Sequence, residues 1–365
     1  MTALRIVVVG PLPPPSGGMA NQTAQLARLL RADGHVVHEV RSNAPYWPRW
    51  LGGLRGLRAV ARLLPYCAEL WRRSAAADVL HVMANSGWSW HLFAAPAVWI
   101  GWLRGVPVVI NYRGGEAAAF LRSSMRWVRP TLRRAAALIV PSAFLRDVFA
   151  GHDVAAEIVP NVVDLARFAP ATARRERGAH IVITRNLEAI YGIDTALRAF
   201  AEVRAELPQA RLTVAGDGPE RKVLEALAAR LGVADPVHFC GSLSPADMPA
   251  LYADADLLLN PARVDNTPNA LLEAWASGVP VVSTDAGGIP FMVESGRTAL
   301  LVSVGDAPAL ASAVLAVLRD DALAAALRRH GLEAARRHAW ASVRPLLVAV
   351  YARVMHPPVQ DSISA

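Results

Sequence analysis

Residues 4–19 read LRIVVVGPLPPPSGGM. The apolar, mostly β-branched run in this stretch is shorter than the apolar core of a signal peptide, and no small-residue cleavage site follows it. It ends in glycine and proline, and a helical pattern follows at 20–32. The stretch therefore predicts a buried first strand, a glycine-containing loop and a first helix, which is the repeating unit of a doubly wound parallel sheet.

The same alternation runs through all 365 residues and predicts an α/β protein with two doubly wound parallel sheets. Expected strands lie at 5–9, 36–40, 79–82, 106–111, 138–141 and 156–159, then at 180–184, 211–215, 237–240, 255–260, 279–283 and 299–302. Prolines 160 and 170 and a polar tail mark a linker. We predict a first domain at 1–160, a linker at 161–178, a second domain at 179–335, and a helix with a tail at 336–365 that packs back on the first domain.

One segment, residues 81–103, has no formally charged side chain. Its apolar part, 92–103, is about half of the ~20 residues that a membrane-spanning helix needs, so we expect a packed helix there. Cys67 and Cys240 lie far apart, without a neighbouring Cys or His at metal-binding spacing. A reduced, cytoplasmic location without a metal site is the expectation.

The formal net charge of +8 is concentrated in the first half of the chain. Residues 1–160 hold 18 arginines and 8 acidic residues, whereas residues 161–365 hold 20 basic and 22 acidic residues. Arginines at 55, 58 and 62 follow helical spacing within 54–64, with leucines between them, which is typical of a helix on an anionic bilayer. We therefore predict an anionic membrane surface as a partner of the first domain. The alternative is an ordinary solvated helix in a protein that favours arginine; nucleic acid is not a predicted partner, because no binding motif accompanies the charge.

The stretch 260–280 follows an expected strand and carries the strongest candidate site. Thr267 and Pro268 are a good cap and first-turn pair for a helix that Gly278 ends. The amino end of such a helix favours a phosphate or diphosphate. Glu273 on the helix and Asp265 before it are then placed to accept hydrogen bonds from ligand hydroxyls. A surface helix with one solvated glutamate is the alternative.

Other candidates also follow expected strands, where ligands of open α/β sheets bind. Arg185 is suited to hold a diphosphate; a salt bridge to Glu188 is the competing interpretation. The glycine pair Gly17-Gly18 lets a ligand approach the backbone closely, and a purely structural loop is the alternative. The turn Gly216-Asp217-Gly218 is a weak motif for which simple turn chemistry is an equal explanation.

Together these segments resemble glycosyltransferase family 4, the retaining enzymes with two Rossmann-like domains called the GT-B fold. The resemblance covers nearly the whole chain and rests on the order of its motifs: Gly17-Gly18, Pro160-Asn161-Val162-Val163-Asp164, Gly216-Asp217-Gly218-Pro219, the stretch from Asn269 to Gly278, and Asp285-Ala286-Gly287-Gly288-Ile289-Pro290. It implies transfer of a sugar from a nucleoside diphosphate sugar with retention of configuration, without a required metal or other cofactor.

The resemblance also assigns roles to residues. Glu273 matches the glutamate that contacts the nucleotide ribose. Asp265 falls where the family has a glutamate, one methylene longer, that contacts the hydroxyl groups of the donor sugar. Arg185 matches the diphosphate-binding arginine, but the lysine usually found six residues later is Tyr191. The loss of that charge is expected to weaken stabilisation of the leaving group unless Arg113 or Arg263 takes its place. No histidine follows the strand 106–111, where the family has one. Arg113 or Glu116 in the turn after that strand is a candidate to contact the sugar or the acceptor, and His81 and His91 are not expected to be catalytic.

The predicted function is a retaining, metal-independent hexosyltransferase at the inner face of the cell membrane, acting on a lipid-linked glycan in surface polysaccharide assembly. The second domain is expected to bind the donor and the basic first domain the acceptor, with a cleft between them. The alternatives are a sugar-nucleotide 2-epimerase and a degenerate nucleotide-binding partner subunit. Predicted catalytic residues are Arg185, Asp265, Glu273 and Arg113; predicted donor-binding residues are Gly17, Gly18, Gly216, Asp217, Gly218, Asn266, Thr267, Asn269 and Glu273.

Overall fold

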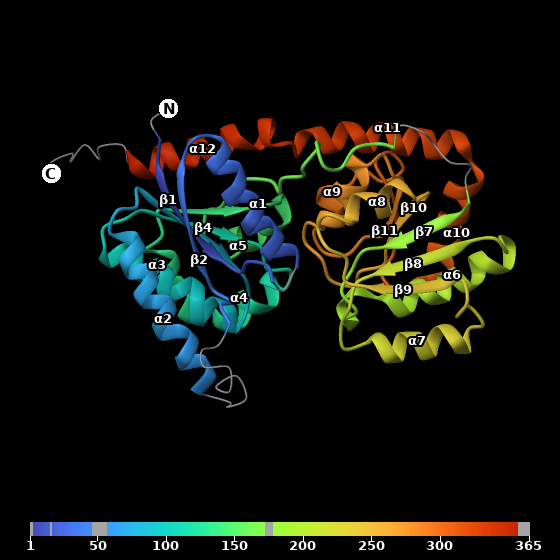
Figure 1. The fold of residues 1–365 in the computed structure, drawn as a ribbon, viewed down its shortest axis with the longest axis horizontal. Coiled ribbons are helices and arrows are strands. Elements are labelled where there is room, and N and C mark those ends of the chain that lie inside the picture. Colours follow the sequence, from blue (N-terminus) through green and yellow to red (C-terminus); the bar gives the residue numbers. More distant parts are fainter. Residues whose placement is uncertain (1–2, 15–16, 46–56, 172–177, 357–365) are drawn as a thin grey trace. The chain divides into compact units, whose positions relative to one another are not determined.

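The computed structural model describes residues 3–14, 17–45, 57–171 and 178–356, with side chains from residue 62 onward in the third range. The chain divides into two compact units, coloured along the sequence in Figure 1. Unit 1 comprises residues 1–160 and 344–365, and unit 2 comprises residues 161–343.

Unit 1 is built on a six-stranded parallel sheet with the order β2-β1-β3-β4-β5-β6. Its strands are β1 (Arg5–Gly10), β2 (Val36–Arg41), β3 (Val79–Ala84), β4 (Val108–Tyr112), β5 (Ala137–Val140) and β6 (Glu157–Ile158). The central strands are buried on both faces, which explains their continuous apolar runs.

Helices cover both faces of this sheet. They are α1 (Gly18–Ala32), α2 (Leu57–Ser74), the π-helical turn η2 (Trp90–Ala94), α3 (Ala95–Leu103), α4 (Ala117–Leu132), α5 (Ala143–Ala150) and α12 (Trp340–Met355), which belongs to unit 1 from Arg344 onward. Helices α2 to α5 share one core with Val7 and Leu80. On the opposite face, Tyr351 of α12 contacts the buried His81 of β3.

Unit 2 has a second six-stranded parallel sheet, with the order β12-β11-β10-β7-β8-β9. Its strands are β7 (His180–Ile183), β8 (Arg211–Ala215), β9 (Val237–Gly241), β10 (Leu257–Asn260), β11 (Val281–Thr284) and β12 (Leu300–Val302). The prediction of twelve strands in two doubly wound sheets is confirmed.

The helices of unit 2 form two layers around its sheet. Helices α6 (Ile193–Glu206), α7 (Arg221–Arg230) and α10 (Ala307–Arg319) pack on the face that carries Ile181 and Ile183. Helices α8 (Met248–Ala253) and α9 (Asn269–Ala276) pack on the face that carries Val182. Helix α11 (Asp321–Arg337) contributes apolar side chains to both cores, and the 3-10 turns η3 (Ala189–Tyr191) and η4 (Ile289–Phe291) follow β7 and β11.

Part of the segment assigned to a linker from the sequence is packed within unit 2. Val163 and Phe168 are buried in its core, where the ring of Phe168 meets that of Tyr252 edge-on at 5.9 Å. Residues 172–177 of the predicted linker lie outside the described residues. Residues 336–343, which the sequence analysis grouped with the tail, cluster with unit 2.

The uncharged segment 81–103 ends in a packed helix, as predicted. It continues from β3 into η2 and α3, where Ala97 and Val98 are fully buried. Within the described part of the chain, no helix combines the length and apolarity that crossing a bilayer requires.

Candidate donor and acceptor sites

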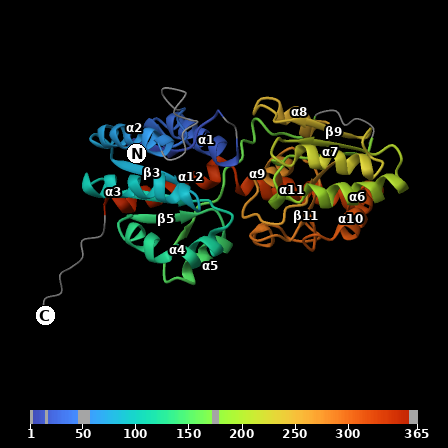
Figure 2. The same cartoon turned by 90° about the horizontal axis from the view of Figure 1, so that it is seen from below.

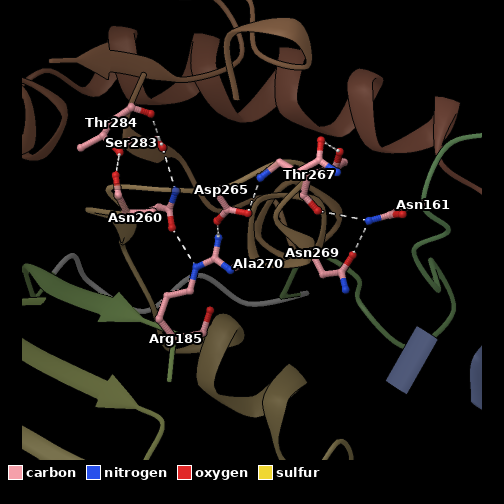
Figure 3. Close-up of polar contacts among 12 residues, drawn as sticks. Asn161, Arg185, Asn260, Asp265, Thr267, Asn269, Ala270, Ser283 and Thr284 are labelled. Atoms are coloured by element: carbon pink, nitrogen blue, oxygen red, sulfur yellow. Dashed lines mark hydrogen bonds and ion pairs between the residues drawn. The ribbon is translucent and has the colours of Figure 1, made fainter. Parts of the chain in front are cut away.

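The carboxyl edge of the unit 2 sheet gathers most of the predicted site residues. The loops after β7, β10 and β11 meet there because these strands are parallel neighbours. Figure 3 shows the polar contacts that join them. The same edge carries the amino end of α9, which follows β10.

Arg185 lies at this edge, where its guanidinium bridges one side chain from the end of β10 and one from the loop after it. Its Nε donates a hydrogen bond to Oδ1 of Asn260 at 2.9 Å, and its Nη2 forms an ion pair with Asp265 (Figure 3). Both charged side chains are only 13% exposed. The competing interpretation, a salt bridge to Glu188, is wrong, since the Glu188 carboxylate instead accepts a hydrogen bond from Asn186 at 3.3 Å.

Asp265 and Asn260 are fixed by further hydrogen bonds. Asp265 accepts a hydrogen bond from the backbone N–H of Asn266 at 2.8 Å, and Asn260 donates one to Ser283 at 2.9 Å. Burial raises the pKa of Asp265, while Arg185 and the Asn266 amide act in the opposite direction. The carboxylate is therefore held in place by protein donors on both oxygens.

Tyr191 occupies the position where the family has a lysine. Its ring lies under the Arg185 guanidinium, with 5.3 Å between the ring centroid and the guanidinium carbon. Arg263, which the sequence analysis offered as a replacement cation, instead binds Asp194 in the first turn of α6 at 2.7 Å. The guanidinium of Arg263 is thus already neutralised by a carboxylate.

The glycines of the neighbouring turns allow backbones to pack closely. A side chain at Gly216 would overlap the carbonyl oxygen of Arg185, and one at Gly287 would overlap that of Asp265. The backbone of Asp217 accepts a hydrogen bond from the N–H of Leu187 at 3.0 Å. These turns therefore set the position of the loops that carry Arg185 and Asp265. Close packing of the backbone is enough to explain why residues 216 and 218 are glycines.

Helix α9 begins one residue later than the predicted cap implies. Pro268 is the N-cap residue, with an extended backbone, and no side chain caps the helix. Thr267 is not the cap, because its hydroxyl is directed to the Asn266 side chain at 3.4 Å. The predicted end of the helix is confirmed, with Gly278 at a φ of +67° just beyond it.

Asn161 ties the predicted linker to the start of this helix. Its Nδ2 donates to the carbonyl oxygen of Thr267 at 3.1 Å and to Oδ1 of Asn269 at 2.9 Å (Figure 3). Asn161 is itself buried. The sequence analysis gave Asn161 no such role, since nothing in its local sequence indicates a partner 108 residues away.

Glu273 lies one turn further along α9, partly exposed, beside a buried tyrosine. The hydroxyl of Tyr252 donates to Oε2 of Glu273 at 3.1 Å and is 2.9 Å from that of Thr184. Burial raises the pKa of Glu273 to about 7, although the Tyr252 hydrogen bond and nearby arginines favour the ionised form. Tyr252 is a second supporting residue that the sequence analysis missed.

In unit 1, the predicted residues lie at the carboxyl edge of the other sheet. Gly17 caps α1 with an extended backbone, and no described atom lies within 4 Å of the position that a Cβ would take. Gly18 is the first residue of the helix. Packing within the described residues therefore gives no reason for glycine at position 17, unlike position 216.

This contrast gives a prediction for two matched substitutions. Gly216→Ala is expected to lower the free energy of unfolding by about 1–3 kcal/mol, because the new methyl group overlaps backbone. Gly17→Ala is expected to change it by less than about 0.5 kcal/mol. Denaturant unfolding of both variants measures this, and equal destabilisation would contradict the assignment of Gly216 to packing and Gly17 to open space.

Arg113 follows β4 and is held by side chains of unit 1. Its Nε donates to Oδ1 of Asn111 at 3.1 Å, and its Nη1 donates to Gln22 at 3.2 Å. Because a guanidinium only donates, Asn111 must direct its Nδ2 toward Nε2 of His81, 3.0 Å away. Nε2 then accepts, so Nδ1 of His81 carries the proton and donates to the Tyr351 hydroxyl at 2.8 Å.

His81 is therefore a neutral structural residue. It is fully buried, and burial together with the Arg113 charge lowers its pKa to about 3. His91 packs against the rings of Trp88 and Phe120. Both histidines therefore make packing or hydrogen-bonding contacts within unit 1, and the His81 contacts explain how Arg113 is oriented at the sheet edge.

Two Rossmann-like α/β domains with polar side chains at the carboxyl edges of their sheets define a protein of the GT-B class. Residues 16–167 match the family model described as Glycosyltransferase Family 4, and residues 178–320 match the one described as Glycosyl transferases group 1. The chain belongs to glycosyltransferase family 4 and is a glycosyltransferase.

Two relatives agree with this assignment. The chain is 30% identical to the GDP-mannose-dependent alpha-(1-6)-phosphatidylinositol monomannoside mannosyltransferase of Mycolicibacterium smegmatis, over 88% of this chain and 91% of the relative. It is also 30% identical to the 2-deoxystreptamine glucosyltransferase of Streptomyces kanamyceticus, over 84% and 86%.

The fold is shared with more distant solved structures. Sucrose-phosphate synthase from Thermosynechococcus elongatus superposes with a TM-score of 0.77 at 20% identity, over 96% of this chain and 99% of the other. The Anabaena protein HepE, solved in complex with UDP and glucose, gives a TM-score of 0.74 at 18% identity, over 96% and 99%.

Proposed function

We propose that the chain transfers a sugar from a nucleoside diphosphate sugar to an acceptor hydroxyl with retention of anomeric configuration. The observation that carries this proposal is a pair of unused hydrogen-bonding atoms at one sheet edge of unit 2. Among the described residues, Nη1 of Arg185 and Oε1 of Glu273 have no hydrogen-bond partner. A diphosphate needs such a donor, and a ribose needs such an acceptor.

Asp265 is the group we assign to the donor sugar. Both of its oxygens already accept one hydrogen bond, from Arg185 and from the Asn266 amide, and each carboxylate oxygen has a second acceptor position. A sugar hydroxyl donating to Asp265 would thus be oriented without displacing the ion pair. The same loop also carries Asn266 and Thr267, and helix α9 begins at Asn269.

In the proposed reaction, the bond between the anomeric carbon and the diphosphate breaks while the bond to the acceptor oxygen forms on the same face of the sugar. The acceptor proton passes to the leaving phosphate oxygen, so no protein nucleophile is required. Arg185 stabilises the negative charge that develops on the diphosphate. The proposed role of Arg113 in unit 1 is to contact the sugar or the acceptor.

The proposed acceptor is a lipid-linked glycan in surface polysaccharide assembly, used at the inner face of the cell membrane. The excess of arginine in residues 1–160 supports a site for an anionic, lipid-linked molecule. The name of the Mycolicibacterium smegmatis relative, which specifies a phosphatidylinositol monomannoside, supports the same class of acceptor.

Single-turnover assays with a panel of nucleotide sugars test this function. Transfer or slow donor hydrolysis that disappears in both Arg185→Ala and Glu273→Ala supports the proposal. Interconversion of the donor sugar without an acceptor would instead identify an epimerase. Tight binding of nucleotide sugars with neither reaction would identify a degenerate partner subunit.

We further propose that transfer needs no metal ion, because the Arg185 guanidinium supplies the positive charge for the diphosphate. Transfer is expected to stay within about twofold after treatment with EDTA and to show no further increase with added Mg²⁺ or Mn²⁺. A loss of about tenfold or more in EDTA, restored by Mg²⁺, would contradict this part of the proposal.

A further inference from the structure

Three neighbouring helices of unit 1 expose large apolar side chains. Helix α3 lies between α2 and α4 and contacts both (Figure 2). Trp102 and Leu103 at the end of α3 are 50% and 61% exposed, and Trp127 on α4 is 65% exposed. Leu64 and Trp71 on α2 are exposed as well. We call this the α2–α3–α4 surface.

The same surface is strongly cationic. Residues 62–74, 90–104 and 117–134 together contain nine arginines and one acidic residue, Glu69. A general preference for arginine over lysine does not explain this, because residues 161–365 balance 20 basic residues with 22 acidic ones. Within the described residues, no carboxylate pairs with Arg104, Arg122, Arg126, Arg133 or Arg134.

Arginine and tryptophan side chains stack where the three helices end. The guanidinium of Arg104 lies 4.9 Å from the Trp71 ring centroid, joining the end of α3 to α2. That of Arg134 lies 3.8 Å from the Trp99 ring and 4.8 Å from the Trp102 ring, joining α4 to α3. These contacts fix a rigid patch in which apolar rings and positive charges alternate.

The helix ends also place this patch away from the candidate acceptor residues. The carboxyl ends of α2, α3 and α4 lead into β3, β4 and β5, so they lie at the amino edge of the sheet. Gly17 and Arg113 follow β1 and β4 at the opposite, carboxyl edge. A partner on the patch would leave the carboxyl edge of unit 1 open.

We propose that the α2–α3–α4 surface docks on an anionic phospholipid bilayer. Tryptophan rings prefer the headgroup level of a bilayer, and arginines attract its anionic headgroups. Exposed leucines beside the arginines favour a bilayer over nucleic acid, since they offer nothing to bases or phosphates but gain from partial burial in lipid. The surface overlaps the predicted helix at 54–64 in α2, where it includes Leu64, and extends it to α3 and α4; residues 54–56 lie outside the described residues.

Flotation with vesicles of equal parts phosphatidylglycerol and phosphatidylcholine tests this inference. The full chain is expected to float with these vesicles at low salt, to be released at about 1 M salt, and not to float with phosphatidylcholine alone. Arg126→Gln with Arg133→Gln should weaken binding by roughly 25-fold, at about fivefold for each neutralised arginine. Leu103→Ser should weaken it by several-fold without changing the charge.

The matched control is Arg230→Gln with Lys222→Gln, which removes the same charge from exposed positions on α7 of unit 2. This control is expected to float like the unchanged chain. Equal loss in both double variants would show that net charge, and not this surface, drives binding, and no flotation at low salt would also overturn the inference. No donor or acceptor is present in the assay, so its failure is distinguishable from failure of the proposed transfer.

Discussion

Replacing Arg185 by glutamine is expected to lower single-turnover transfer by about 10²–10³-fold, the usual cost of removing one preorganised donor from a developing negative charge. The Arg185 guanidinium makes three contributions at once: it binds Asn260, it pairs with Asp265, and its Nη1 remains for the ligand. The variant loses all three. Arg185→Lys should recover only a small part of the rate, because an ammonium group cannot bridge Asn260 and Asp265 in the same fork geometry.

A control must separate the loss of this site from the loss of any ion pair in unit 2. Arg211 pairs with Asp254 at 2.7 Å, and it begins β8 at the amino edge of the same sheet. Arg211→Gln removes the same charge and an ion pair of similar length, and its transfer rate is expected to stay within about twofold. If a folded Arg185→Gln also stayed within about twofold, the Arg185 cluster would not be the diphosphate site.

The strands could be predicted from the sequence because each is a short apolar run next to a helical pattern. Two errors at strand starts follow from proline, whereas β10 was predicted from 255 and begins at Leu257 without a proline before it. Strand β4 was predicted from residue 106 and begins at Val108, while β11 was predicted from 279 and begins at Val281. Pro107 and Pro280 precede them and have no N–H, although their carbonyl oxygens accept hydrogen bonds from Leu80 and Leu258.

Only those residues of the candidate site that belong to a local sequence pattern could be predicted. Arg185 and Asp265 were chosen because each follows an expected strand, and the parallel sheet brings those ends together. Their mutual ion pair was not predicted, since it joins residues 80 positions apart. Tyr252 and Asn161 were missed for the same reason, because a buried partner on another element leaves no pattern in one sequence.

Glu273→Gln is expected to stabilise the folded chain at pH 8 while weakening donor binding. Burial raises the pKa of Glu273 to about 7, above its ordinary value of 4.5, so the folded state prefers the neutral carboxyl group. Below pH 4.5 the Glu273 carboxyl group is neutral in the folded and in the unfolded chain and does not lower the stability. As the pH rises from 4.5 to 7, only the unfolded chain ionises freely, and stability falls by about 2–3 kcal/mol. Glutamine avoids this loss.

Thermal unfolding at pH 5 and pH 8 measures the effect on stability. The variant and the original chain should differ little at pH 5, and at pH 8 the variant should unfold about 2–4 °C higher for each kcal/mol gained. Tyr252→Phe provides a second check, because the Tyr252 hydrogen bond lowers the Glu273 pKa. Removing this hydrogen bond should raise the Glu273 pKa and so move the midpoint of the pH-dependent loss of stability to a higher pH.

Donor binding should depend on pH in the opposite direction. Ionised Glu273 is the better acceptor for ribose hydroxyl groups, so affinity for a nucleoside diphosphate is expected to rise between pH 6 and pH 8 and to level off above that. Calorimetric titration of the original chain and of Glu273→Gln measures this. The variant should bind more weakly at pH 8 and show no rise, since an amide does not titrate. A rise of equal size in both proteins would assign the titration to another group and remove Glu273 from the nucleotide site.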